Sequence, residues 1–179
     1  SYFENGSLSD EGFFSKNKST GERKYYYERG KLKSQRHFEN DLEEGPYIEY
    51  YENGQTKTTY SFKKGKLDGE GLDYDKDGKL FSRVVYNNDI AESVRYFDKT
   101  GKQISYAERK DHSLAFDSYG PDGAKRSRLN YDEKGNQTGQ AIYYYPSGKL
   151  RETDEYKNGK LNGLTVVYYR NGKKKSETP

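Results

Sequence analysis

The stretch YYENGQTKTTYSFKKGKLDG, residues 50–69, decides the fold. It begins with two tyrosines and continues with a turn sequence, an alternating segment that ends at Phe62, a second turn and a glycine. Related stretches are YYERGKLKSQRHFENDLEEG at residues 26–45 and YYPSGKLRETDEYKNGKLNG at residues 144–163. Such near-copies indicate an internal repeat, which is typical of an array of small structural units.

The repeat has a period of about 24 residues. The glycine after each leading aromatic residue recurs at intervals of 24, 24, 24, 23, 22, 25 and 24 residues, at Gly6, Gly30, Gly54, Gly78, Gly101, Gly123, Gly148 and Gly172. An aromatic residue lies four positions before every one of these glycines, and a second series lies eight positions after them, with Arg109 as the exception. The two series interleave, so the basic unit is a half-repeat of one strand and one turn.

Local chemistry predicts hairpins. Gly preceded by Asn, Arg, Asp or Ser is a turn signal, because Gly adopts the positive φ that tight turns require. The intervening segments are rich in aromatic and β-branched residues, as in QAIYYY and LTVVYY, and none shows a helical period. We therefore predict an all-β, elongated antiparallel meander of tandem hairpins of about 24 residues, with essentially no helix. A second glycine series is expected to mark the far turns, at Gly21, Gly45, Gly69, Gly139 and Gly163.

The domain prediction is a single repeat array over residues 1–179. Its units cover about 2–25, 26–49, 50–73, 74–96, 97–118, 119–143 and 144–167, with a partial unit at 168–179. A ladder of aromatic residues is expected to hold the strands in register, each ring stacking on that of the next strand. The predicted ladder is Tyr26, Phe38, Tyr50, Phe62, Tyr74, Tyr86, Phe97, Tyr131, Tyr144, Tyr156 and Tyr168.

Candidate binding residues lie outside this ladder. Tyr27, Tyr51, Tyr145 and Tyr169 follow ladder residues and are expected on the opposite face, where exposed tyrosines can serve as interface anchors. Residues 108–128 depart from the repeat, and Arg109, His112 and Tyr119 in this stretch are further candidates for partner contact. The stretch has two interpretations, a degenerate join between two regular sub-arrays or a specialised recognition patch.

Composition excludes several other classes of function. The chain has 32 basic and 29 acidic residues and a net charge of +3, so a nucleic-acid partner is not expected. It has no cysteine and no apolar segment long enough to span a membrane. His112 with Asp111 and Asp117 lacks metal-ligand spacing, so we predict no catalytic residue, metal or cofactor. The basic run RNGKKKSETP at the C-terminus is expected to be a solvated, frayed end.

Residues 50–70 and 144–164 resemble the variant MORN repeat of bacterial proteins, and the resemblance extends from Tyr2 to about Lys175. It implies a non-enzymatic binding role, in many cases as an antitoxin or immunity-type protein that neutralises a partner toxin. An alternative is a cell-envelope or cell-wall carbohydrate-binding protein, although the chain has no Trp. The expected state is a monomer or an end-to-end dimer. The start at Ser1 suggests a missing N-terminal segment, and the compartment, cytoplasmic or exported, is left undecided.

Overall fold

The computed structural model describes residues 1–179 and consists of strands and turns, with no helix in either part of the chain. The predicted all-β hairpin fold is confirmed. Residue contacts divide the chain into two compact units, Ser1–Asp89 (unit 1) and Ile90–Pro179 (unit 2). The single array and the bounds of its seven repeat units stay predictions.

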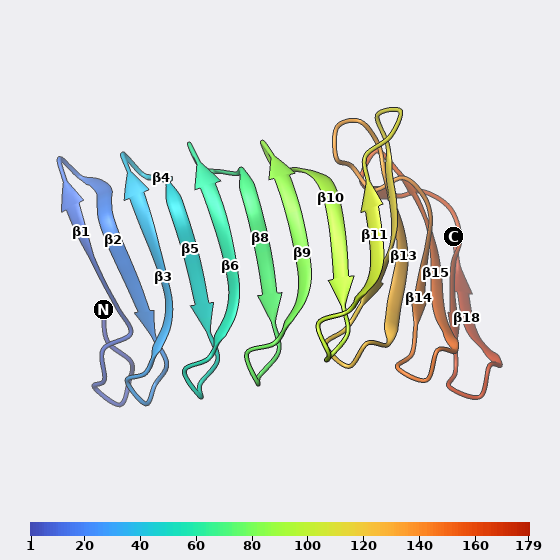
Figure 1. The fold of residues 1–179 in the computed structure, drawn as a ribbon, viewed down its shortest axis with the longest axis horizontal. Coiled ribbons are helices and arrows are strands. Elements are labelled where there is room, and N and C mark those ends of the chain that lie inside the picture. The colour runs from blue at the N-terminus through green and yellow to red at the C-terminus, as the bar shows by residue number, and fades with distance from the viewer. The chain divides into compact units, whose positions relative to one another are not determined.

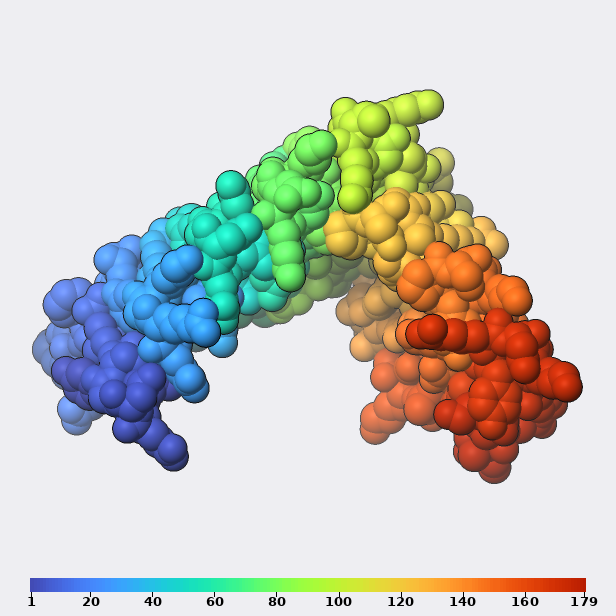
Figure 2. Space-filling model, turned by 90° about the horizontal axis from the view of Figure 1, so that it is seen from below, coloured from blue at the N-terminus to red at the C-terminus, as the bar shows by residue number.

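Unit 1 is a meander whose strands follow one another in chain order (Figure 1). The strands are β1 (Asp10–Ser15), β2 (Lys18–Tyr26), β3 (Leu32–Glu39), β4 (Leu42–Glu43), β5 (Gly45–Tyr50), β6 (Thr56–Lys63), β7 (Lys66–Leu67), β8 (Gly69–Tyr74) and β9 (Leu80–Asn87). The hydrogen-bonded order is β1-β2-β3-β5-β6-β8-β9, with β4 on β3 and β7 on β6. Figure 2 shows the same progression along unit 1, from blue to green.

Unit 2 has nine strands and one interruption. They are β10 (Ile90–Phe97), β11 (Gln103–Glu108), β12 (Leu114–Tyr119), β13 (Lys125–Tyr131), β14 (Gly139–Tyr144), β15 (Leu150–Lys157), β16 (Lys160–Leu161), β17 (Thr165–Tyr168) and β18 (Lys174–Thr178). β10 pairs with β11, and β12 begins a seven-stranded sheet ordered β12-β13-β14-β15-β17-β18, with β16 on β15. The break between β11 and β12 falls inside the irregular residues 108–128.

The C-terminal basic run is ordered, contrary to the prediction of a frayed end. Lys174–Thr178 forms β18 and pairs with β17, with Thr165 opposite Thr178 and Val167 opposite Ser176. Backbone pairing needs no apolar side chain, so a strand of charged residues can close the meander when its neighbour supplies the hydrogen bonds.

The glycines of the main series form five-residue turns, which we call near turns. In each, the first amide donates to the fifth carbonyl and the glycine amide donates to the first carbonyl, as at Tyr27–Lys31, where both bonds are 2.8 Å. Gly30 has a φ of 77°, which explains the glycine. The other near turns in this series are Phe3–Ser7, Tyr51–Gln55, Asp75–Lys79, Asp98–Lys102, Gly120–Ala124, Tyr145–Lys149 and Tyr169–Lys173.

The far turns are not made by the second glycine series, so that expectation is wrong. They are two-residue turns with positive φ at both positions, such as Asn40 (51°) with Asp41 (72°). Gly45 instead begins β5, and its φ of 75° lies at the bend that carries the chain from β4 into β5. Glycine is needed at that bend because few other residues adopt such a φ.

The expected stacking of ladder residues on one another is also wrong for β5 and β6. Tyr50 is opposite Thr56, whereas Phe62 is opposite Gly45, so the two aromatic residues lie at opposite ends of this strand pair. Next to the near turn, Lys57 is an extra residue on β6 between Thr56 and Thr58, so the register shifts between Glu49 and Tyr50.

Ring contacts run through the middle of the strands instead. Tyr47 stacks on Tyr60 with ring centroids 6.3 Å apart, and Tyr60 meets Tyr86 edge-on at 6.1 Å. Towards β1, Arg36 lies 4.8 Å from the Tyr47 ring centroid, and Arg23 lies 5.4 Å from that of Tyr25. We call these residues, with Tyr25, the arginine–aromatic row. Its end towards β1 alternates cations and rings, an attractive arrangement for half-buried guanidinium groups.

Gly71, which lies against two rings of this row, tests how tightly the row is packed. A Cβ atom at Gly71 would lie 2.6 Å from the Tyr60 ring and 3.1 Å from that of Tyr86. We expect Gly71→Ala to lower the free energy of unfolding by about 1–3 kcal/mol, because rigid rings cannot move aside. Denaturant unfolding followed by circular dichroism measures the change.

Gly120→Ala is the matched control. Its Cβ atom would lie 2.8 Å from the guanidinium end of the Arg126 side chain, which can swing aside. The loss should be clearly smaller than for Gly71→Ala; equal losses would contradict rigid packing of the row.

Candidate functional site

The candidate site is the edge of unit 1 formed by its near turns. β2 ends at Tyr26 and β5 ends at Tyr50, so Tyr27 and Tyr51 are the first residues of turns and not strand residues on a second face. The Tyr27 hydroxyl donates to the Tyr50 carbonyl at 2.7 Å, and the Tyr51 hydroxyl donates to the Tyr74 carbonyl at 2.8 Å. Each tyrosine therefore ties its turn to the next repeat, and we call this contact a tyrosine clamp.

A third clamp occurs in unit 2, where the Tyr145 hydroxyl donates to the Tyr168 carbonyl at 2.8 Å. Clamped tyrosines are half-buried, and burial raises the pKa of the Tyr27 and Tyr51 hydroxyls. Tyr169, the fourth predicted anchor, is 50% exposed. Their contact with a partner stays a prediction, while the clamp is a role that the sequence analysis missed.

Other near turns carry aspartate at the clamp position. The Asp75 carboxylate accepts from the amides of Asp77 and Lys79, both at 2.9 Å, and thus caps its own turn. Asp98 does the same for Thr100 at 2.8 Å and Lys102 at 3.1 Å. A tyrosine joins neighbouring turns, whereas an aspartate stabilises one turn alone. The signal was present in the sequence as the residue three positions before each glycine.

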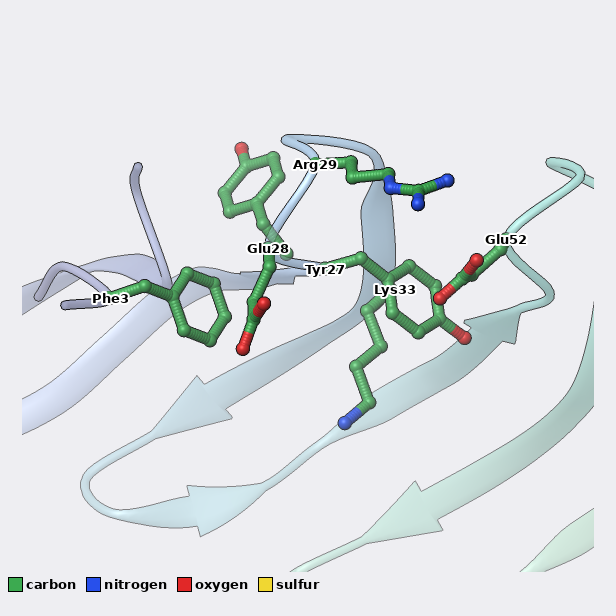
Figure 3. Close-up of a pocket in the computed structure, with 7 residues that line it drawn as sticks. Phe3, Tyr27, Glu28, Arg29, Lys33 and Glu52 are labelled. Atoms are coloured by element: carbon green, nitrogen blue, oxygen red, sulfur yellow. The ribbon is translucent and has the colours of Figure 1, made fainter. Parts of the chain in front are cut away.

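A hollow opens beside the first clamp. Phe3 occupies the clamp position of its turn but has no hydroxyl to donate. The space, about 440 Å³, is lined by Phe3, Tyr26, Tyr27, Glu28, Arg29, Lys33 and Glu52. Figure 3 shows Phe3 on one side and Tyr27 with Lys33 on the other, with Glu52 arriving from the next turn. The Lys33 ammonium lies 5.8 Å from the Tyr27 ring centroid, so this hollow combines aromatic walls with charges of both signs.

Further bonds fix the tips of these turns. The Lys31 ammonium donates to the Glu52 carbonyl at 2.6 Å, and the Asn53 side-chain amide donates to the Lys76 carbonyl at 2.8 Å. The side chains of Glu28 and Arg29 remain exposed. The edge is thus held in place by its backbone and presents charged side chains to solvent.

Arg109 is directed inward, although the sequence suggested a partner contact. Its guanidinium donates to the carbonyls of Ala91 at 3.1 and 3.2 Å, His112 at 3.2 Å and Asp132 at 2.7 Å. Its side chain is only 12% exposed. Arg109 therefore joins β10 to two turns beside the break between β11 and β12.

Of the other residues singled out in the irregular stretch, His112 meets Arg109 through its backbone carbonyl. His112 is exposed in a far turn with a φ of 63°. Asp117 pairs with Lys125 at 2.8 Å and with Arg128 at 3.3 Å. The Tyr119 ring lies 5.6 Å from that of Tyr96. The structure contains no cluster of three or more side chains suited to a metal ion, and no helix long and apolar enough to cross a membrane.

The tyrosine clamp can be tested by removing one oxygen atom. We expect Tyr51→Phe to lower the free energy of unfolding by about 0.5–1.5 kcal/mol, because the hydrogen bond to the Tyr74 carbonyl is lost while the ring stays. Tyr169→Phe, whose hydroxyl is not clamped, should change it by less than about 0.5 kcal/mol. Urea unfolding measures both changes, and equal losses of unfolding free energy for the two variants would show that the clamp does not stabilise the fold.

The inward role of Arg109 predicts a cost even for a conservative change. Arg109→Lys keeps the charge but cannot reach three carbonyls, so we expect a loss of about 2 kcal/mol. Arg128→Lys, at a side chain 59% exposed, should lose less than about 0.5 kcal/mol. A neutral Arg109→Lys in thermal unfolding would contradict this role.

The chain was compared with curated proteins, solved structures and protein-family models. No curated protein matches the chain. A crystal structure of a GtfA/B complex bound to UDP and GlcNAc is similar at 16% identity with a TM-score of 0.20, over 69% of this chain. The chain spans 22% of the length of that protein.

A family model described as the MORN repeat variant matches five segments, at residues 19–40, 43–64, 67–88, 137–158 and 161–179. They cover more than half of the chain and leave out residues 89–136, which include the break between β11 and β12. The five segments repeat the strand-and-turn unit described above. The chain belongs to the MORN repeat variant family.

Proposed function

We propose that this repeat scaffold binds a protein partner through the near-turn edge of unit 1. The observation that carries the proposal is the succession of near turns held by the clamps of Tyr27 and Tyr51. A surface fixed before binding loses little conformational entropy when a partner docks. The exposed charges of Glu28, Arg29 and Glu52 then supply specificity.

The chemistry of the edge favours a protein partner over a sugar. Sugar recognition by stacking requires a free aromatic face. The Tyr27 ring is half-buried and has the Lys33 ammonium 5.8 Å away, and the Tyr145 ring has the Arg170 guanidinium 5.7 Å away. A cation over a ring occupies the face that a sugar would use. A mixed set of charges around a fixed hollow suits a protein surface of complementary charge.

The finer proposal is an antitoxin or immunity-type role, in which the edge covers the working surface of a toxin. It is supported by the family resemblance and by the variation of charged tips on a constant turn. Recognition of this kind discriminates partners by attractive and repulsive charge pairs. No catalytic group is required, because occlusion alone neutralises the partner.

Co-expression with a toxin encoded beside this protein's gene tests the proposal. We expect rescue of growth by the unaltered protein, and loss of rescue and of co-purification with Glu28→Lys/Glu52→Lys. Glu39→Lys, an equally exposed charge reversal at the far edge of β3, is the control and should still rescue. Circular dichroism melts verify that every variant is folded.

Failure of the protein to bind or neutralise that toxin would reject the antitoxin role. Equal loss with Glu39→Lys would reject the near-turn edge. Binding on a glycan array that is abolished by Tyr51→Ala and Tyr145→Ala, but kept by the corresponding Phe variants, would favour the carbohydrate-binding alternative.

A further inference from the structure

The near-turn edge of β14–β18 in unit 2 carries a surplus of positive charge. Lys149, Arg170, Lys173 and Lys175 are exposed there and form no ion pair. The acidic residues of this edge are already engaged, Glu152 by Arg151 at 3.6 Å and Glu177 by Lys174. The surplus matters because the chain as a whole is nearly balanced, at +3.

Two tyrosines lie among these cations. The Arg170 guanidinium is 5.7 Å from the Tyr145 ring centroid, and the Lys175 ammonium is 5.9 Å from that of Tyr169. A hollow of about 240 Å³ is lined by Tyr145, Pro146, Ser147 and Arg170. The edge therefore combines cations that form no ion pair with aromatic surface, as in grooves that bind extended peptides.

The equivalent edge of unit 1 lacks this surplus, so the repeat itself does not produce it. Arg170 takes the place in its near turn that Glu52 holds in unit 1, and Lys173 takes that of Gln55. The unit 1 counterpart of Lys175 is Lys57, which is paired with Glu49 at 2.8 Å. The same turn position therefore carries a negative charge, Glu52, beside the hollow of unit 1 and a positive charge, Arg170, beside the hollow of unit 2.

The spacing of the turns restricts the shape of the ligand. Neighbouring near turns are separated by two strands, or about 9.6 Å. A polyproline II helix has three residues per turn and a rise of about 3.1 Å, so every third side chain recurs on one side after about 9.3 Å. An acidic residue at every third position would match the turns of Lys149 and Lys173.

We propose that this edge binds an acidic, proline-rich segment of a partner protein in the polyproline II conformation. Its carboxylates pair with Lys149 on one near turn and with Arg170 and Lys173 on the next, and its proline rings pack against Pro146 in the hollow and against the exposed part of Tyr169. The surface is separate from the near-turn edge of unit 1 and does not depend on the function proposed for that edge. Duplex DNA and membranes are anionic too, but neither presents an exposed apolar ring beside each charge.

Fluorescence anisotropy with labelled (Glu-Pro-Pro)3 tests the proposal. Its composition-matched control has the three glutamates together, followed by six prolines. We expect the periodic peptide to bind at least about fivefold more tightly than the block peptide, with affinity falling as salt rises. Equal binding of the two peptides would contradict the proposed match between the spacing of the near turns and the repeat of the polyproline II helix.

Two double variants locate the surface. Arg170→Glu/Lys173→Glu should weaken binding of (Glu-Pro-Pro)3 by at least about tenfold. Lys157→Glu/Lys160→Glu makes the same charge change at the exposed far edge of β15–β16 and should alter it by less than about twofold. Equal losses would reject the site, as would tighter binding to phosphatidylserine-containing vesicles or duplex DNA. Both variants are first checked for unaltered thermal unfolding.

Discussion

Hydrogen bonds from a turn to the neighbouring repeat, made by far turns and by the near turns that begin with a clamping tyrosine, are the constraint on which this fold depends. At the far edge, the Gly65 amide donates to the Glu43 carbonyl at 2.8 Å, and the Asp89 amide donates to the Leu67 carbonyl at 2.9 Å. At the near edge, the tyrosine clamps do the same work with side chains. Unit 1 has no fully buried hydrophobic side chain, so both edges of its sheet must be held by such local contacts.

The middle of the strands is stabilised by contacts between half-buried polar and aromatic groups. In the arginine–aromatic row, Arg36 lies between the Tyr25 and Tyr47 rings, at 5.1 and 4.8 Å from their centroids. Its charge is balanced by Glu43 at 2.6 Å. Such a row buries the stem of a long cation and both ring faces without requiring a second layer of structure. A chain with only 30% hydrophobic residues can therefore remain ordered.

A constant turn with variable tips separates stability from recognition. The backbone bonds of the turns at Tyr51 and Tyr169 have nearly the same lengths, 2.8 and 2.9 Å in one and 2.8 Å for both in the other. The next residue is Glu52 in the first turn and Arg170 in the second. Because neither side chain takes part in the hydrogen bonds of its turn, its charge can change at little cost to the fold. Two edges of one protein can thus favour partners of different charge.

The sequence by itself determined the repeat, the hairpins and the absence of helix, since a period of about 24 residues and recurrent turn glycines are local properties. Strand register and long-range contacts were decided only by the tertiary structure. Phe62 lies opposite Gly45, because the five-residue near turn and the extra residue Lys57 on β6 set the register. The Tyr27 hydroxyl finds its acceptor 23 residues away, and Arg109 reaches carbonyls on three separate segments. A strand period predicts the face of a side chain but not its partner, which is decided only when distant turns are brought side by side.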